Sequence, residues 1–142
     1  MTVLTDKKIN EYIKEGKLKI IPFEKNAVTT NGYDMLTEDF TIKPGEFMLV
    51  RSREKIEMPD DVTAVPFLRT TYAFKGLILS PGIMDAGYKG FLRFAIYNAS
   101  KEIVTLKNKE ETKRAIHILF LKTDGKTEIP FGGRKGEKNN IL

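Results

Sequence analysis

The sequence predicts an all-β fold, a sandwich or barrel, with one short helix at its front. After residue 17, many short runs of apolar and β-branched residues alternate with turn residues such as Pro, Gly, Asn and Asp. No internal repeat or linker interrupts this pattern. The 142 residues therefore suit one domain with a substantial core.

The front helix is expected over residues 5–15. Thr5 or Asp6 can cap its start, and Gly16 can end it. Three apolar side chains recur at the spacing of one helical face, namely Ile9, Tyr12 and Ile13. We assign this helix a packing role.

The strands that follow are predicted from apolar runs and from the turns between them. Turn signals lie at 43–45 and 58–61, where Pro presets φ or Gly admits a positive φ. Pro66 indicates a bulge or an edge position in its strand. The predicted strands cover residues 18–21, 40–42, 47–51, 62–68, 91–97, 103–106 and 115–121.

The composition is that of an ordinary soluble protein, with 41% hydrophobic and 30% charged residues. The chain has no cysteine, so it offers no disulfide and no thiolate metal ligand. Its start lacks a signal-peptide pattern, and no apolar run is long enough for a membrane span. The net charge of +5 is spread along the chain. We expect a cytoplasmic protein that binds neither membrane nor nucleic acid.

The stretch 62–98 carries the candidate chemistry. Arg69 is followed by two hydroxyls, Thr70 and Thr71, a combination that suits an anionic oxygen ligand. Asp85 lies in a glycine-flanked turn beside Tyr88, as a positioned base beside a flat ligand would. The alternative is a plain β-hairpin with a surface acid and a surface arginine. Taken alone, these residues slightly favour that alternative.

The wider pattern resembles the dUTPase and dCTP deaminase superfamily. Residues 69–76 and 81–90 are similar to two of its motifs, and further pieces follow the family order at 4–23, 32–35, 43–47 and 58–61. The resemblance reaches to about residue 122. It implies a dUTPase-like distorted β-barrel of the jelly-roll type over residues 1–122. Residues 123–142 would then be a flexible glycine-rich C-terminal arm.

The resemblance gives Asp85 the role of the base that orients and deprotonates the water attacking the α-phosphorus. Tyr88 would pack under the deoxyribose, although ordinary core packing also explains a tyrosine there. The base edge would be read by the hairpin backbone, at Gly82, Ile83, Ile96 and Tyr97.

The phosphate-binding residues implied by the resemblance are Arg69, Thr70, Thr71 and Lys75. Thr71 is bulkier than the glycine that the family often has there. A structural ion pair is the alternative for Arg69.

Asp34 matches a family aspartate that helps to hold Mg²⁺ at the triphosphate through water. A turn aspartate that bonds its own backbone is the alternative. His117 stands where the family usually has a glutamine that donates to phosphate. It can donate in the same way, or it can be a buried, neutral histidine with hydrogen bonds.

The tail is weakly similar to the glycine-rich C-terminal motif of dUTPases. By that similarity, Phe131 would stack on the base and Arg134 would meet the γ-phosphate. A disordered basic tail is the alternative.

Two departures argue against deamination. The family's deaminases have a proton-moving glutamate where this chain has Ala95, and an arginine where it has Phe74. We therefore predict a dUTP diphosphatase that uses Mg²⁺ and forms a homotrimer with sites shared between subunits. A non-catalytic nucleotide-binding or regulatory protein with the same fold is the alternative, and a dCTP deaminase is less favoured.

Overall fold

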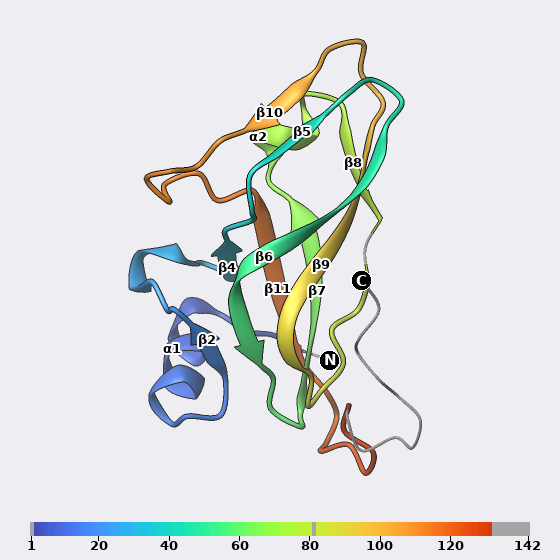
Figure 1. Ribbon diagram of the computed structural model, residues 1–142. Coiled ribbons are helices and arrows are strands. Elements are labelled where there is room, and N and C mark those ends of the chain that lie inside the picture. Colours follow the sequence, from blue (N-terminus) through green and yellow to red (C-terminus); the bar gives the residue numbers. More distant parts are fainter. Residues whose placement is uncertain (1, 81, 132–142) are drawn as a thin grey trace.

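The computed structural model describes residues 2–80 and 82–131, and it confirms the predicted all-β architecture (Figure 1). Two curled sheets and a two-stranded ribbon make up the fold. The first sheet holds β1 (Thr2–Val3), β3 (Val28–Thr29), β4 (Gly32–Met35), β7 (Val62–Leu68) and β11 (Ile116–Lys122). The second holds β2 (Lys19–Ile21), β6 (Phe47–Glu57), β8 (Leu77–Ser80) and β9 (Lys89–Asn98). The ribbon pairs β5 (Phe40–Ile42) with β10 (Val104–Leu106).

Strand β11 is the centre of the first sheet, and every pairing it makes is antiparallel. It pairs with β7 along its full length on one side, and with β1 and β4 on the other. The register sets His117 of β11 opposite both Asp34 of β4 and Phe67 of β7. Two candidate site residues, Asp34 and His117, therefore meet through strand pairing alone.

In the part of the chain that the structure describes, β7 is an edge strand, which is one of the two possibilities that Pro66 indicated. Among the described residues, its only pairing besides β11 is an isolated bridge between Ala64 and Met84, whose backbones exchange both hydrogen bonds across the open side. Backbone groups alternate in direction along a strand, so the nitrogen of Pro66 faces the same open side as that of Ala64. The missing N–H of Pro66 therefore costs no hydrogen bond between β7 and β11.

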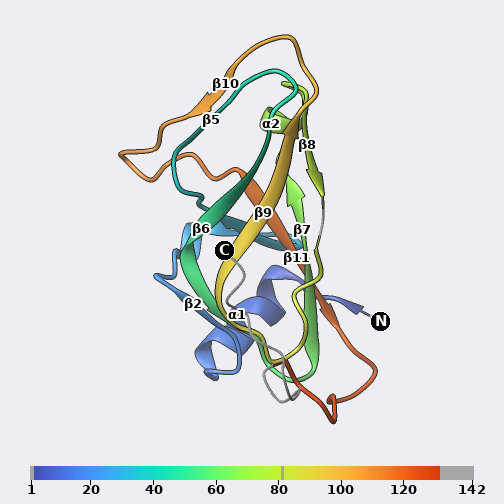
Figure 2. The same cartoon turned by 45° about the vertical axis from the view of Figure 1, so that its right-hand side comes forward.

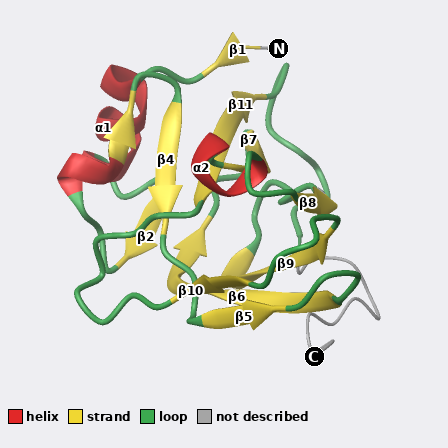
Figure 3. Cartoon of the chain, turned by 90° about the horizontal axis from the view of Figure 1, so that it is seen from above, coloured by secondary structure: helices red, strands yellow, loops and turns green. Residues whose placement is uncertain are grey.

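The predicted front helix is α1 (Asp6–Lys14), and Gly16 follows it with φ of 71°. Ile9 and Tyr12 are buried on its inner face. The structure adds a 3₁₀ turn, η1 (Lys25–Ala27), and a second short helix, α2 (Thr70–Ala73). Figure 3 shows α2 beside the end of β7. In the described part of the chain, no helix has the length and apolar character needed to cross a membrane.

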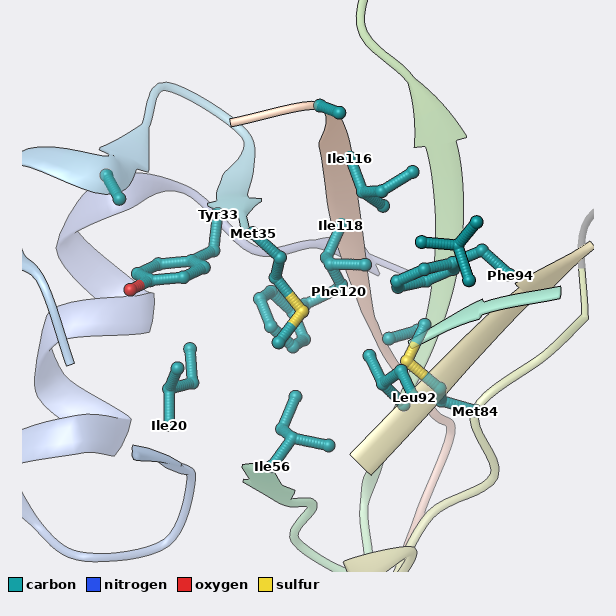
Figure 4. Close-up of a cluster of buried hydrophobic side chains, with 14 of the residues drawn as sticks. Ile20, Tyr33, Met35, Ile56, Met84, Leu92, Phe94, Ile116, Ile118 and Phe120 are labelled. Atoms are coloured by element: carbon teal, nitrogen blue, oxygen red, sulfur yellow. The ribbon is translucent and has the colours of Figure 1, made fainter. Parts of the chain in front are cut away.

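The core lies between the two sheets (Figure 4). Seen from the side in Figure 2, β6 and β9 of the second sheet run in front of β7 and β11. Alternate residues of these strands point inward and interdigitate, as period-two patterning requires. The buried side chains include Tyr33, Met35, Ile116, Ile118 and Phe120 from the first sheet, and Ile20, Ile56, Leu92 and Phe94 from the second.

A bulge interrupts the pairing of β6 with β9 between Arg51 and Lys55. Ser52 within it is fully buried, and its hydroxyl accepts a hydrogen bond from Leu92 N–H at 2.9 Å. Glu54 in the same segment is only 1% exposed. Inward-facing residues alternate through this segment, so Glu54 carries a carboxylate into the interior, where it pairs with Arg114.

Candidate active site

Three predicted site residues form what we call the donor cluster: Asp34, Arg69 and His117. The Oδ1 atom of Asp34 is 2.9 Å from His117 Nδ1, and its Oδ2 atom is 3.4 Å from Arg69 Nε. Asp34 is 8% exposed, whereas the side chains of His117 and Arg69 are 28% and 47% exposed. One buried carboxylate therefore holds two nitrogen-bearing side chains that reach the surface.

The histidine ring also leaves no room for a side chain at Gly32 of β4. A Cβ atom added at Gly32 would lie 2.7 Å from His117 Cε1 and 2.2 Å from the Ile118 carbonyl oxygen. Both distances are far inside normal contact, so this position accepts only glycine. The absent side chain makes room for the imidazole beside Asp34.

Arg69 enters the cluster from the end of β7. Its N–H donates to the Ala115 carbonyl at 2.9 Å, and its own carbonyl accepts from Tyr72 and Ala73 at the start of α2. Thr70 and Thr71 follow as exposed residues of α2, while Tyr72 is buried beneath them. The two predicted hydroxyl residues thus follow Arg69 directly, on a short turn that the buried Tyr72 anchors.

A buried ion pair supports the cluster from behind. Arg114 Nη1 is 3.2 Å from Glu54 Oε2 and donates to the Asp34 carbonyl at 2.8 Å. The Arg114 carbonyl in turn accepts from Arg69 Nη1 at 3.4 Å. Burial raises the pKa of the Glu54 carboxyl, while the Leu36 N–H and Arg114 act against that rise.

Sequence reasoning missed Glu54 and gave Arg114 no role. The signal was weak, because Glu54 stands among charged neighbours, Arg51, Arg53 and Lys55, that point to solvent in an ordinary exposed strand. Glu54 nevertheless lies on the inward face of β6, at every second position with Val50, Ser52 and Ile56.

The second group of predicted residues lines a hollow of about 230 Å³, which we call the hairpin hollow. It brings together five residues that the sequence singled out from two separate segments. The lining residues are Gly82, Ile83, Met84, Asp85, Tyr88, Phe91, Leu92, Arg93 and Phe131.

Phe131 closes one side of the hairpin hollow. Its ring centroid is 5.1 Å from that of Tyr88, with the planes tilted by 59°, and its N–H donates to the Ala86 carbonyl at 2.8 Å. Pro130 packs against Gly87, where an added Cβ would lie 2.6 Å from the proline Cβ and where φ is 85°. Gly87 therefore serves both the turn and the docking of the tail.

The tail before Phe131 is tied to the barrel by backbone hydrogen bonds. Thr123 and Thr127 donate to the carbonyls of Asp61 and Asp60, both at 2.9 Å. The expected mobility of residues 123–142 stays a prediction, and residues 132–142, including Arg134, lie outside the described part of the chain.

Asp85 occupies the turn of the hairpin hollow and is partly exposed. Its carbonyl accepts from Tyr88 N–H at 3.1 Å, which closes the turn. Tyr88 itself is held by a hydrogen bond from its hydroxyl to the Phe91 carbonyl. Within residues 2–80 and 82–131, the Asp85 carboxylate has no hydrogen-bond or ion-pair partner. It is therefore available to water.

Three predicted residues lie away from both groups. The Ile96 side chain is 1% exposed and belongs to the core, whereas Tyr97 lies on the outer face of β9, opposite Phe47 and Ile78. Lys75 lies over the Tyr72 ring at 5.5 Å and lines a different hollow with residues 102–105. Their proposed contacts with nucleotide stay predictions.

The donor cluster and the hairpin hollow are far apart within one chain. Met84, in the hollow, is bridged to Ala64 of β7, and Arg69 follows five residues later. At roughly 3.3 Å per strand residue, Ala64 and Arg69 are about 16 Å apart along the backbone. The turn that holds Asp85 is therefore bridged to the first half of β7, whereas Arg69 follows the last residue of that strand.

The donors present do not fit a metal ion held directly by this chain. Both oxygens of Asp34 already have nitrogen partners, His117 and Arg69. Among the described residues, no three His, Cys, Asp or Glu side chains are grouped as metal ligands. A contact of Asp34 with Mg²⁺ through water stays a prediction.

Comparison with known proteins identifies the family. A family model described as dCTP deaminase-like matches residues 36–112 of this chain. The chain belongs to the dCTP deaminase-like family.

Two relatives show the range of names within this family. The chain is 30% identical over 155 residues to a probable deoxyuridine 5′-triphosphate nucleotidohydrolase of Sulfolobus islandicus rod-shaped virus 1, covering 98% of this chain and 96% of that protein. It is 28% identical over 170 residues to a dCTP deaminase of Sulfurisphaera tokodaii, covering 99% of this chain and 91% of that protein. The relatives are thus named as enzymes of two activities.

Solved dUTPases share the fold. The EIAV dUTPase aligns with a TM-score of 0.57 and 20% identity, over 78% of this chain and 86% of that one. A mutant dUTPase of S. aureus phage phi11, reported with a structural Mg(II) ion, aligns with a TM-score of 0.57 and 20% identity, over 74% and 90%. These likenesses confirm the predicted dUTPase-like fold.

Proposed function

We propose that this protein is a dUTP diphosphatase, which hydrolyses dUTP to dUMP and pyrophosphate. The observation that carries the proposal is the environment of the Asp85 carboxylate. Its carboxylate lies in a hollow beside Tyr88 and Phe131, with no partner among the described residues to neutralise or occupy it. A carboxylate in that setting suits a general base toward water.

The proposed reaction needs one activated water and one leaving group. The water oxygen forms a bond to the α-phosphorus, and the bond from that phosphorus to the oxygen bridging to the β-phosphorus breaks. The proton of the water passes to Asp85, and pyrophosphate leaves. Tyr88 and Phe131 present aromatic surfaces suited to the deoxyribose and the base.

Arg69, with Thr70 and Thr71, is proposed to bind the phosphates, because guanidinium and hydroxyl groups match phosphate oxygens. The substrate is proposed to arrive as its Mg²⁺ complex, since magnesium usually takes substrate phosphates and retains several waters.

The separation of the two groups supports a site shared between copies of the chain. Ala64, which is bridged to Met84 beside Asp85, is about 16 Å from Arg69 along the backbone at strand spacing. We propose a homotrimer in which one copy provides the hairpin hollow and another the donor cluster. Light scattering should then give three times the 16.2 kDa chain mass, and a monomer at micromolar concentration would contradict the shared site.

The chemistry of β9 favours hydrolysis over deamination. By the family resemblance, Ala95 stands at the position of the glutamate of the deaminases, and a methyl group cannot carry a proton. Phe74, in place of an arginine, is 86% exposed.

A product assay tests the proposal. The protein is incubated with Mg²⁺ and, separately, with dUTP, dCTP, dTTP and dATP, and pyrophosphate and ammonia are measured. Pyrophosphate from dUTP without ammonia is expected. Ammonia from dCTP would establish deamination instead, and tight binding of dUTP without any product would favour a non-catalytic nucleotide sensor.

A further inference from the structure

The surroundings of Asp34 suggest a role that differs from metal binding. Its two carboxylate oxygens face two different side chains, His117 at 2.9 Å and Arg69 at 3.4 Å. A metal ion bound directly to Asp34 would have to share these oxygens with His117 and Arg69. The carboxylate is also nearly buried, so its partners are closer to solvent than it is.

The contact with Asp34 determines which part of Arg69 is left for a ligand. Asp34 takes the Nε edge of the guanidinium, and the Arg114 carbonyl takes Nη1 at 3.4 Å. Within the described ranges, Nη2 has no partner, and it belongs to a side chain that is 47% exposed. A guanidinium held along one edge presents its remaining donors in a fixed direction.

The backbone that carries Asp34 is itself immobilised. Arg114 donates to the Asp34 carbonyl at 2.8 Å, and Arg114 is held by Glu54, a carboxylate 1% exposed. Glu54 also accepts from the Leu36 N–H with both oxygens at 3.1 Å. A buried pair of this kind is costly to disturb, because removing one partner leaves the other charge unpaired.

We propose that Asp34 is a positioning residue, whose carboxylate aligns Arg69 for the phosphates of the ligand without acting through a metal ion. His117 braces the same carboxylate from the β11 side, and the Glu54–Arg114 pair holds the whole unit against β4. The inference rests on the proposed function only in taking the ligand to be a polyphosphate.

Without metal, the affinity for an anion should change in opposite directions on removal of Asp34, depending on whether Asp34 aligns Arg69 or has no positioning role. Removing a negative charge beside an anion site should tighten anion binding if Asp34 has no positioning role. If Asp34 aligns Arg69, its removal should weaken binding, because the loosened guanidinium must be ordered again by the ligand.

The test uses inorganic tripolyphosphate as the probe and isothermal calorimetry as the readout, in EDTA and again in Mg²⁺. Asp34→Ala should raise the Kd by about tenfold in both media, the loss expected when a charge-assisted hydrogen bond is no longer prepared. In an Arg69→Ala background, the same substitution should change the Kd by less than about twofold, since the two residues act as one unit. Glu38→Gln, which breaks the exposed Glu38–Arg51 pair of 2.8 Å, is the matched control and should not change the Kd.

Several results would overturn the proposal. They are unchanged or tighter binding by Asp34→Ala in EDTA, a loss that appears only in Mg²⁺, and full additivity with Arg69→Ala. Failure of the wild-type protein to bind tripolyphosphate would also overturn it. None of these results depends on turnover, so hydrolysis of dUTP can be found or not found independently of them.

A measurement on the wild-type chain covers the case in which Asp34→Ala does not fold. In ¹⁵N spectra, His117 Nδ1 should carry a proton, and the signals of its ring should stay sharp when Mn²⁺ is added without phosphate. Selective broadening of those signals by Mn²⁺ would place a metal at Asp34 and contradict the proposal.

Discussion

Two aspartates near opposite ends of β7 have opposite surroundings. Asp34 is nearly buried, and each of its oxygens has a nitrogen partner. Asp85 is partly exposed, and in the described ranges its carboxylate has no partner. A carboxylate that is already bonded can orient its neighbours, whereas one left open to water can accept a proton. The donor cluster around Asp34 is therefore suited to binding a charged ligand, whereas the hairpin hollow around Asp85 is suited to proton transfer.

The largest expected effect comes from Asp85→Asn. The amide preserves size and can hold a water, but it cannot accept that water's proton. We expect kcat for dUTP to fall by about a hundred- to ten-thousandfold, while calorimetric binding of a non-hydrolysable dUTP analogue is kept. The exposed Asp124→Asn is the control. An unchanged kcat in Asp85→Asn would show that Asp85 is not the general base, and the proposed difference in role between the two aspartates would be wrong.

Mixing two inactive variants tests whether the regions belong to different copies. Asp85→Asn and Arg69→Ala are each expected to be nearly inactive at low dUTP concentration. If the subunits are unfolded together at equal amounts and refolded, random trimers should regain about a quarter of the wild-type activity, because each shared site draws one group from each of two copies. A mixture no more active than its components would show that one chain holds the complete site.

A smaller effect is expected where the tail meets the hairpin hollow. Phe131→Ala removes an aromatic contact with Tyr88, at 5.1 Å between ring centroids. Such pairs are worth about 0.5–1.5 kcal/mol, so kcat/KM for dUTP should fall by roughly two- to tenfold while circular dichroism is unchanged. Ending the chain after Lys122 should have at least this effect. Full activity of the shortened protein would show that the tail has no role in catalysis.

The smallest effect concerns an ion pair outside both regions. Lys122 Nζ lies 2.7 Å from Asp61 Oδ2 and 3.1 Å from the Tyr12 hydroxyl, and thereby ties α1 to β11. Hydrogen bonding to Asp61 raises the pKa of Lys122 to about 12. Burial raises the pKa of Asp61, but Lys122 outweighs it, so the pKa of Asp61 lies below its usual 3.8.

The direction of these shifts fixes the pH window. The contribution of Lys122 to folding stability is complete below pH 10.5, and it is lost as the pH rises through about 12. That of Asp61 is present above pH 3.8 and is lost as the pH falls through its lower native pKa. Lys122→Met should therefore lower Tm slightly at neutral pH, with a smaller difference at either extreme. The exposed Lys101→Met should leave Tm unchanged.

The sequence predicted most of the barrel, because turn residues and apolar runs mark its strands directly. It missed β3 and β4, since polar residues around Asn31 and a carboxylate in the middle of 32–35 are typical of a loop. It also missed α2, because Thr70 and Thr71 are weak helix formers and only the buried Tyr72 anchors that turn.

The hairpin hollow was easier to predict than the donor cluster for a structural reason. Most of its residues are neighbours in one turn, so their proximity follows from the chain itself. Asp34 and His117 are 83 positions apart and meet only through the register of β4 with β11. No local pattern encodes a register between distant strands, and a glutamate is not expected on the inward face of a strand.

The proline on the open side of β7 has a consequence for solubility. An edge strand with free N–H groups is a template on which a strand of another molecule can continue the sheet. Pro66 removes the donor at that position without weakening the pairing of β7 with β11. A strand added along this side would therefore find one donor missing, in a segment, residues 62–68, that is otherwise apolar and strongly β-forming. We expect Pro66 to lower the tendency of this edge to continue the sheet with another molecule.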